Sequence, residues 1–323
     1  SKSFRKRSDF IQHKNKIAKF VEVPQMGGSS LFKKINVILN SPIIALKLIR
    51  LLISKGNDNA MIHLRPPGNI SFISLFVLPF FRNVKKFAKY AGEWENKNNL
   101  NLSYRIQTYL LSKKLFFNGP VFVYTRKDYN NNIIPSFTSS LTKKQIDKAK
   151  TISKKKYIEN MLIVIFAGRL SYNKGVDVLI KSMKEFSNLN NKDFKLYICG
   201  EGEEKPNLKI LAKKLKIYEN IEWTGWIGTS DLHKLYEKAH VICQPTRNQE
   251  SWGKSIAEGM IYSCIPLCSN IGGLKNQLQE TPFLLFEPEN FKEISKKLNI
   301  IVNDKNKYEF YKDRSLKNKY IKS

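Results

Sequence analysis

The second half of the chain alternates short apolar runs with amphipathic segments, and this pattern constrains its fold more than any other feature. The run MLIVIFA at 161–167 is continuous, as expected for a buried strand of a parallel sheet. The segment after it places five apolar residues on one helical stripe: Val176, Leu179, Ile180, Met183 and Phe186. Strand and helix patterns continue to alternate as far as residue 302, which predicts a doubly wound parallel α/β sheet.

Two glutamates lie just after one of these predicted strands. Glu250 falls in the loop that follows the apolar run at 240–245, and Glu258 falls about one and a half turns into the next helix. Gly253 lies between them, where the helix start offers free backbone N–H groups to an anion. A glutamate pair at this spacing is by itself more often an exposed helix face, so its meaning depends on context.

A second motif supplies that context at the end of the predicted strand 161–167. It reads GRLSYNKG over 168–175, and its Arg169 and Lys174 flank a loop next to a helix N-terminus. A diphosphate in this loop would meet a forked guanidinium, an ammonium and free N–H groups. A basic surface turn in a lysine-rich protein is the alternative, but two motifs in this order make that explanation the weaker one.

Together the two motifs resemble those of glycosyltransferase family 4, whose members are retaining enzymes with the GT-B fold. The resemblance implies an α/β architecture of two Rossmann-like, doubly wound parallel-sheet domains that face a cleft. It implies that the chain moves a hexose-type sugar from a nucleotide diphosphate sugar, in bacterial-type surface polysaccharide or glycolipid synthesis. The acceptor would be a carbohydrate or a polyprenyl- or other lipid-linked molecule.

The resemblance also assigns roles to residues of this chain. Arg169, Lys174 and Glu250 would be catalytic, because the cations stabilise the departing diphosphate and the carboxylate faces the sugar. Further donor contacts are expected from Gly168, Gly202, Gly253, Lys254, Ser255 and Glu258, the last holding the ribose. No metal ion and no cofactor are expected.

The chain departs from the family pattern in two places. The carboxylate that usually follows the glycine pair at 272–273 is matched only by Asn276. The histidine that many members carry in the first domain has no counterpart in the segment KYAGEW at 89–94. Arg65 and Glu93 are therefore the candidate cleft residues of the first domain.

A chain of 323 residues exceeds the size at which one core usually suffices, so two domains are expected. We expect an acceptor-side Rossmann-like domain at 1–157, a donor-binding one at 158–304, and a helix at 305–323 that returns toward the first domain. In the first domain, candidate strands at 18–23, 60–64, 84–90 and 120–124 alternate with helices at 41–54, 70–80 and 100–116. Because four strands are few for such a domain, we expect it to be truncated at its amino end.

The net charge of +29 is concentrated in the first half of the chain. Residues 1–160 carry 30 Lys and Arg against 8 Asp and Glu, a net charge of +22, whereas 161–323 carry 26 against 19, a net charge of +7. A basic half is typical of proteins that bind nucleic acid, an anionic membrane surface or an anionic substrate. Since no nucleic-acid-binding motif is present, an anionic membrane surface is the favoured partner and nucleic acid is not expected.

The apolar segments of the first half are too short to predict a membrane span, which needs about 20 apolar residues. Residues 70–81 are interpreted as a buried helix. Residues 41–54 contain Lys47 and Arg50 and could lie in a membrane interface, but a core helix with snorkelling cations is favoured. The four cysteines predict reduced thiols. We therefore expect a cytoplasmic protein, peripheral on the inner face of the cell membrane.

Two alternatives stay open at this point. One is a GT-B epimerase that acts on a nucleotide sugar without transferring it. The other is a non-enzymatic basic protein that binds a membrane or a nucleic acid.

Overall fold

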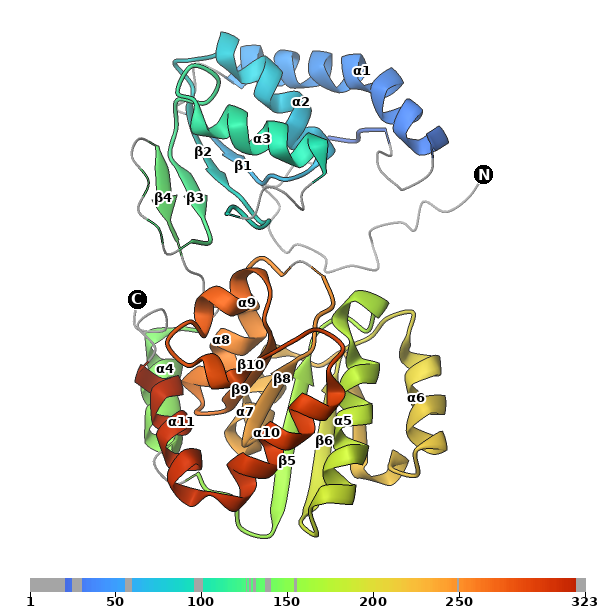
Figure 1. Cartoon of the computed structure of the whole chain (residues 1–323). Coiled ribbons are helices and arrows are strands. Elements are labelled where there is room, and N and C mark those ends of the chain that lie inside the picture. Colours follow the sequence, from blue (N-terminus) through green and yellow to red (C-terminus); the bar gives the residue numbers. More distant parts are fainter. Residues whose placement is uncertain are drawn as a thin grey trace.

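Figure 1 shows the computed structural model of the chain, in which two α/β domains lie one above the other. The structure describes residues 21–24, 31–55, 60–95, 101–125, 127, 129, 132–136, 141–153, 156–248 and 250–317. Within these residues each domain has its own parallel sheet, with four strands in the first and six in the second. The predicted class of two parallel-sheet α/β domains is confirmed.

The first domain is built on a sheet of strand order β1–β2–β3–β4, in which every pairing is parallel. Its strands are β1 (Met61–Leu64), β2 (Lys85–Lys89), β3 (Val121–Val123) and β4 (Ile133–Pro135). Its helices are α1 (Leu31–Lys55), α2 (Asn69–Val77), which continues into the 3₁₀ turn η2 (Leu78–Phe80), and α3 (Leu102–Ser112). The buried faces of the strands pack with these helices around Leu75, Leu78 and Leu111.

The second domain is built on a parallel sheet of strand order β10–β9–β8–β5–β6–β7. Its strands are β5 (Met161–Ala167), β6 (Asp193–Cys199), β7 (Ile221–Gly225), β8 (Val241–Gln244), β9 (Ile265–Ser269) and β10 (Leu285–Phe286). Its α-helices are α4 (Lys143–Ser153), α5 (Val176–Leu189), α6 (Lys205–Lys214), α7 (Thr229–Lys238), α8 (Lys254–Ile261), α9 (Gly272–Gln277), α10 (Phe291–Asn303) and α11 (Lys305–Lys317). The short 3₁₀ turns are η4 (Tyr172–Lys174), η5 (Tyr218–Asn220) and η6 (Pro282–Leu284).

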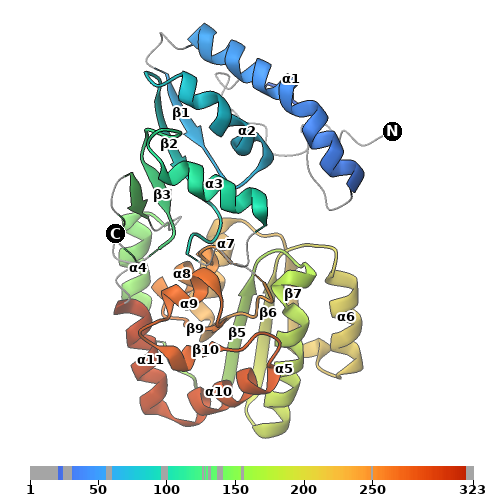
Figure 2. The same ribbon diagram turned by 45° about the horizontal axis from the view of Figure 1, so that its top comes forward.

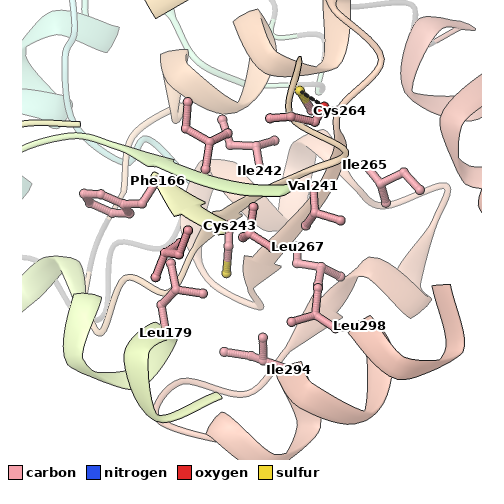
Figure 3. Packing of buried hydrophobic residues seen from close by; sticks show 14 of the residues in the cluster. Phe166, Leu179, Val241, Ile242, Cys243, Cys264, Ile265, Leu267, Ile294 and Leu298 are labelled. Atoms are coloured by element: carbon pink, nitrogen blue, oxygen red, sulfur yellow. Dashed lines mark hydrogen bonds between the residues drawn. The ribbon is translucent and has the colours of Figure 1, made fainter. Parts of the chain in front are cut away.

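The continuous apolar runs form the centre of this second sheet. Strand β5 pairs with β6 over its whole length and with β8 on its other side, so it lies at the centre of the sheet. Its side chains are covered on both faces, since the successive residues Val164, Ile165 and Phe166 are all fully buried. Figure 3 shows strand side chains such as Phe166, Cys243 and Leu267 meeting Leu179 of α5 and Leu298 of α10 in one core. This core holds the strand ends, and the loops that leave them, in fixed positions.

The second domain extends further along the chain at both ends than its central sheet. Helix α4 packs against α7 and α8, and its Ala149 is buried in the second core, although the predicted boundary lay at 157–158. Helix α11 packs against α8, β9 and α10, and its Tyr311 stacks on Phe283. Buried Lys156 joins these pieces, since its Nζ donates to the carbonyl oxygens of Tyr236 and Ala239 at 2.8 Å. The predicted return of 305–323 toward the first domain stays a prediction.

Some local predictions were wrong. The segment 41–54 belongs to a helix that begins ten residues earlier and continues through Pro42, and this helix is largely exposed rather than part of the core. Because its apolar stretch Ile35–Ser54 has 20 residues, the expectation that no apolar segment of the first half reaches the length of a membrane span was also wrong. Residues 21–23 of the predicted strand 18–23 form no strand, and the rest of that segment lies outside the described residues.

Candidate active site

The two sequence motifs meet where the second sheet reverses its strand order. Strands β6 and β7 are added on one side of β5, after which the chain crosses back and adds β8, β9 and β10 on the other side. Loops that follow β5 and β8 therefore leave in opposite directions, and a crevice opens between them at the carboxyl ends of the strands. The motif 168–175 follows β5 and the motif around Glu250 follows β8.

Lys174 and Glu250 form an ion pair across this switch point. Lys174 Nζ donates a hydrogen bond to Glu250 Oε2, and the two side chains are only 26% and 15% exposed. The surface pair Lys234–Asp231 is 66% and 63% exposed by comparison. Because desolvation offsets much of the attraction within a partly buried pair, an incoming anion can compete for its cation.

Arg247 holds the loop that carries Lys174 in place. Its guanidinium donates two hydrogen bonds to the carboxylate of Asp177, at 2.8 and 2.7 Å, and one to the carbonyl oxygen of Tyr172 at 2.7 Å. It also lies 4.2 Å from the centre of the Tyr172 ring and donates to Glu289 at 2.7 Å. Burial alone would raise the pKa of Asp177, but the hydrogen bonds and positive charge of Arg247 outweigh it and lower that pKa.

The loop that carries Glu250 is held by close backbone packing. The N–H of Gly273 donates to the Glu250 carbonyl oxygen at 2.8 Å, and a Cβ on Gly273 would lie 2.1 Å from the Ser251 oxygen. Gly253 follows with a φ of 68°, in the left-handed region, and leads directly into α8. The glycine pair and Gly253 thus fix the loop and direct the first N–H groups of α8 toward the crevice.

A cavity of about 410 Å³ lies beside the first motif and collects several predicted donor residues. Gly168, Arg169 and Ser255 line it, together with Glu201 and Trp226. The indole of Trp226 is 79% exposed, so its ring is available to a ligand in this cavity. The arrangement offers a flat apolar surface next to a guanidinium and a helix start, which suits a nucleotide.

The remaining predicted donor residues fall in or next to these loops. A Cβ on Gly202 would lie 2.1 Å from the Leu170 oxygen, so this glycine lets the turn after β6 pack on the first motif. Lys254 is the exposed first residue of α8. Glu258 is buried one turn after Ser255 on the same helix. Arg169 is largely exposed and pairs with Glu203 at 3.3 Å, so it does not join the Lys174–Glu250 pair.

A larger cavity of about 1100 Å³ opens between the two domains. Its wall from the first domain includes Glu93 and Glu95, and its wall from the second includes Asn276, Lys275 and Arg247. Burial, reinforced by the charge of Glu95, raises the pKa of Glu93. Glu93, a predicted cleft residue, lines this cavity, as does Asn276, which matches the family's carboxylate position. Arg65, the other predicted cleft residue, is exposed just after β1 and is not part of this lining.

Sequence analysis missed three residues of the site. Arg247 is a lone cation after a strand, and nothing in the sequence connects it with Asp177 seventy residues earlier. Trp226 lies between two glycines in the loop after β7, which was a detectable sign of an exposed aromatic residue. Glu95 lies two residues after Glu93 and accepts a hydrogen bond from Thr125.

Metal-ligand chemistry is not prominent in the part of the chain that the structure describes. There, no group of three or more His, Cys, Asp and Glu side chains is placed to hold a metal ion. All four cysteines are buried free thiols, at 199, 243, 264 and 268.

The sequence from residue 147 to 318 matches the family model described as "Glycosyl transferases group 1". An uncharacterised glycosyltransferase of Haemophilus influenzae is 30% identical over 161 residues, 49% of this chain and 44% of that protein. The Campylobacter jejuni enzyme named GalNAc-alpha-(1->4)-GalNAc-alpha-(1->3)-diNAcBac-PP-undecaprenol alpha-1,4-N-acetyl-D-galactosaminyltransferase is 26% identical over 146 residues, 45% of this chain and 39% of that protein. The aligned regions thus span less than half the length of these curated relatives.

Among solved structures, a mutant of S. aureus TarM in complex with fondaparinux, alpha-GlcNAc-glycerol and UDP has a similar fold. The TM-score is 0.64 at 19% identity, over 87% of this chain and 56% of that one. The two-domain architecture is that of GT-B glycosyltransferases, as the sequence predicted.

Proposed function

The chain belongs to the glycosyl transferases group 1 family, and from this membership we propose a specific glycosyl-transfer reaction. The chain moves a hexose-type sugar from a nucleotide diphosphate sugar to a carbohydrate or lipid-linked acceptor, with retention of anomeric configuration. The observation that carries the proposal is the Lys174–Glu250 ion pair at the switch point of the second sheet.

The donor diphosphate takes the place of Glu250 as the partner of Lys174. Arg169 and the first N–H groups of α8 contribute further positive potential, so the leaving group is neutralised by protein groups without a metal ion. Once Lys174 is drawn to the diphosphate, Glu250 is left to offset the positive charge that develops on the sugar. Charge separation in the transition state is thereby matched by a pair that is already in place.

The nucleotide occupies the 410 Å³ cavity. Its base stacks on the exposed Trp226 ring, and Ser255, which lines the cavity, contacts the ribose. Glu258, buried one turn further along α8, is the second proposed ribose contact. UDP in the S. aureus neighbour supports a nucleotide diphosphate as the ligand class.

The acceptor enters the 1100 Å³ cavity between the domains. Glu93 and Asn276 face it from opposite sides and can hydrogen-bond acceptor hydroxyls. The undecaprenol-linked acceptor in the name of the C. jejuni relative supports a lipid-linked acceptor at an anionic membrane surface, which the basic first half also favours. The chain would then work in the cytoplasm, at the inner face of the cell membrane.

The test begins with a thermal-shift screen of nucleotide sugars, followed by transfer assays with the donor that binds. Lys174→Met should weaken donor binding by about 1.5–3 kcal/mol, because it removes a charge-assisted contact. Glu250→Gln should keep donor binding and lose most of the transfer rate. The matched surface pair provides controls, since Lys234→Met and Asp231→Asn should leave both quantities unchanged.

Two results would overturn the proposal. Unchanged donor affinity in Lys174→Met together with near-normal transfer in Glu250→Gln would show that the donor does not bind at the Lys174–Glu250 pair. A free isomerised nucleotide sugar as the product, with no transfer, would identify an epimerase instead. Retention is checked by the anomeric configuration of the transferred sugar.

A further inference from the structure

Helix α1 is apolar on nearly all sides but is covered on only one of them. Its segment Ile35–Ser54 has a mean hydropathy of 1.8, and among the described residues it is the one helix long and apolar enough to cross a membrane. Only 11% of that segment is buried. A helix that is hydrophobic all round is normally enclosed by protein or lipid, so its open side needs a partner.

The inner face of α1 explains how the helix is attached to the first domain. Ile44 and Leu52 are buried, and Ala45, Leu48 and Ile49 are partly covered, at the spacing of one helix face. This face packs against α2. Because those contacts hold α1 against the first domain, the helix lies on the surface of this domain and does not stand apart from it as a membrane-spanning helix would.

The outer face of α1, about a third of a turn around the helix from the covered face, carries exposed aliphatic side chains. Ile35, Leu39, Leu46 and Ile53 follow one another at intervals of four or seven residues, and all are exposed. Figures 1 and 2 both place α1 at the outer edge of the first domain, and Figure 1 shows it along the edge away from the second domain. Covering this face would therefore leave the cavity between the domains accessible.

The charge of α1 indicates what covers the outer face. The helix contains five Lys or Arg residues and no Asp or Glu. Arg50 is exposed beside the aliphatic face, and Lys47 lies on the flank, where its Nζ donates to the Glu22 carbonyl oxygen at 2.7 Å. Two such helices would repel each other as a pair of copies, whereas an anionic lipid surface complements both the charge and the apolar face.

We propose that α1 lies in the plane of an anionic lipid leaflet, with Leu39, Leu46 and Ile53 inserted below the headgroups. The inference rests on the membrane part of the proposed function and deepens it, since it replaces a general electrostatic attraction by a defined apolar contact. The first domain would be held at the surface through α1, and the cavity between the domains would lie close to acceptors anchored there.

Vesicle binding of the full chain tests the proposal. The probes are vesicles of phosphatidylcholine alone or mixed with phosphatidylglycerol, and the variant is Leu39→Gln/Leu46→Gln/Ile53→Gln. Binding of the wild-type chain should require phosphatidylglycerol, and part of it should persist in high salt because apolar contacts are not screened. The variant should bind at least roughly tenfold more weakly.

A matched control uses aliphatic residues of similar exposure elsewhere on the surface. Leu102→Gln/Leu189→Gln/Ile210→Gln changes two leucines and one isoleucine in α3, α5 and α6 and should bind vesicles like the wild-type chain. Equal losses in both triple variants, or no loss in the α1 variant, would overturn the proposal. Loss of self-association instead of vesicle binding in the α1 variant would assign this face to a second copy and would also overturn it.

Insertion depth separates an in-plane helix from a span. Because the four native thiols are buried, a fluorophore can be attached selectively at Leu46→Cys. Lipids brominated near the headgroup should quench it more than lipids brominated near the chain end, and the reverse order would contradict an in-plane helix. Donor affinity of the α1 variant should equal that of the wild-type chain. Vesicle binding without affinity for any nucleotide sugar would refute the proposed function while supporting this inference.

Discussion

Arg247 is predicted to be a positioning residue whose loss weakens both the fold and donor binding. Its side chain is 9% exposed, and the Asp177 side chain that it holds with two hydrogen bonds is 26% exposed. The contact with Glu289 involves a carboxylate that is 60% exposed and therefore contributes little. Arg247→Met keeps much of the side chain's length but removes every one of these hydrogen bonds.

The expected cost follows from the burial of the pair. Removing one partner of a fully buried ion pair costs about 3–5 kcal/mol. Water reaches Asp177 in part, so we expect a smaller loss of about 2–3 kcal/mol in the free energy of unfolding. Since Arg247 also holds the Tyr172 carbonyl oxygen two residues before Lys174, donor affinity should fall even in conditions where the variant stays folded.

A double-mutant cycle with Asp177→Asn measures the pair itself. Urea unfolding of the wild-type chain, both single variants and the double variant should give a coupling energy of about 1–3 kcal/mol. Isothermal titration with the donor, under native conditions, should show reduced affinity in Arg247→Met. Arg314→Met, at an exposed position on α11, is the control and should change neither quantity. Strictly additive effects of the two variants would refute the reasoning.

Three further predictions concern stability. Burial and the charge of Lys156 lower the pKa of His240 from 6.5 to about 4, against a smaller opposing effect of its hydrogen bond to a backbone oxygen. The unfolded chain thus binds this proton more readily, and about 3 kcal/mol of stability should be lost as pH falls from 7 to 4. His240→Gln should remove that part of the slope in pH-dependent urea titrations. Gly273→Ala would place a methyl group 2.1 Å from the Ser251 oxygen, so it should lower the melting temperature and transfer activity, whereas Gly228→Ala, with open space around it, should do neither. Lys156→Met leaves buried carbonyl oxygens without a donor and should cost about 2–4 kcal/mol in urea unfolding.

The second domain could be predicted from the sequence because its central strands β5, β8 and β9 are covered on both faces. A run such as MLIVIFA identifies a buried strand without reference to its neighbours. The strand order 3-2-1-4-5-6 of a doubly wound sheet then places the loops after β5 and β8 at one crevice, which brings Lys174 and Glu250 together. Local pattern and known topology were sufficient for this part of the site.

The first domain was harder because its elements carry weaker or misleading patterns. The predicted helix started at 41, whereas α1 begins at Leu31 and runs through Pro42, a residue that is more common in the first turn of a helix than in its interior. Strand β4 has three residues and shows no periodicity that a sequence window can detect. Exposure is a property of packing, and α1 has the composition of a core helix, so only the structure shows that its apolar outer face is uncovered.

The charged groups of the site are held in position by contacts with one another and with the core of the second domain. The core in Figure 3 fixes β5 and β8, and Arg247 at the end of β8 fixes the loop after β5 through Asp177 and Tyr172. That loop sets the position of Lys174, which pairs with Glu250 on the loop after β8. The two motifs are therefore joined twice, once through the Arg247–Asp177 ion pair and once through the Lys174–Glu250 ion pair. In the proposed reaction the donor diphosphate would replace Glu250 as the partner of Lys174, while the Arg247–Asp177 contact would still hold the two loops together.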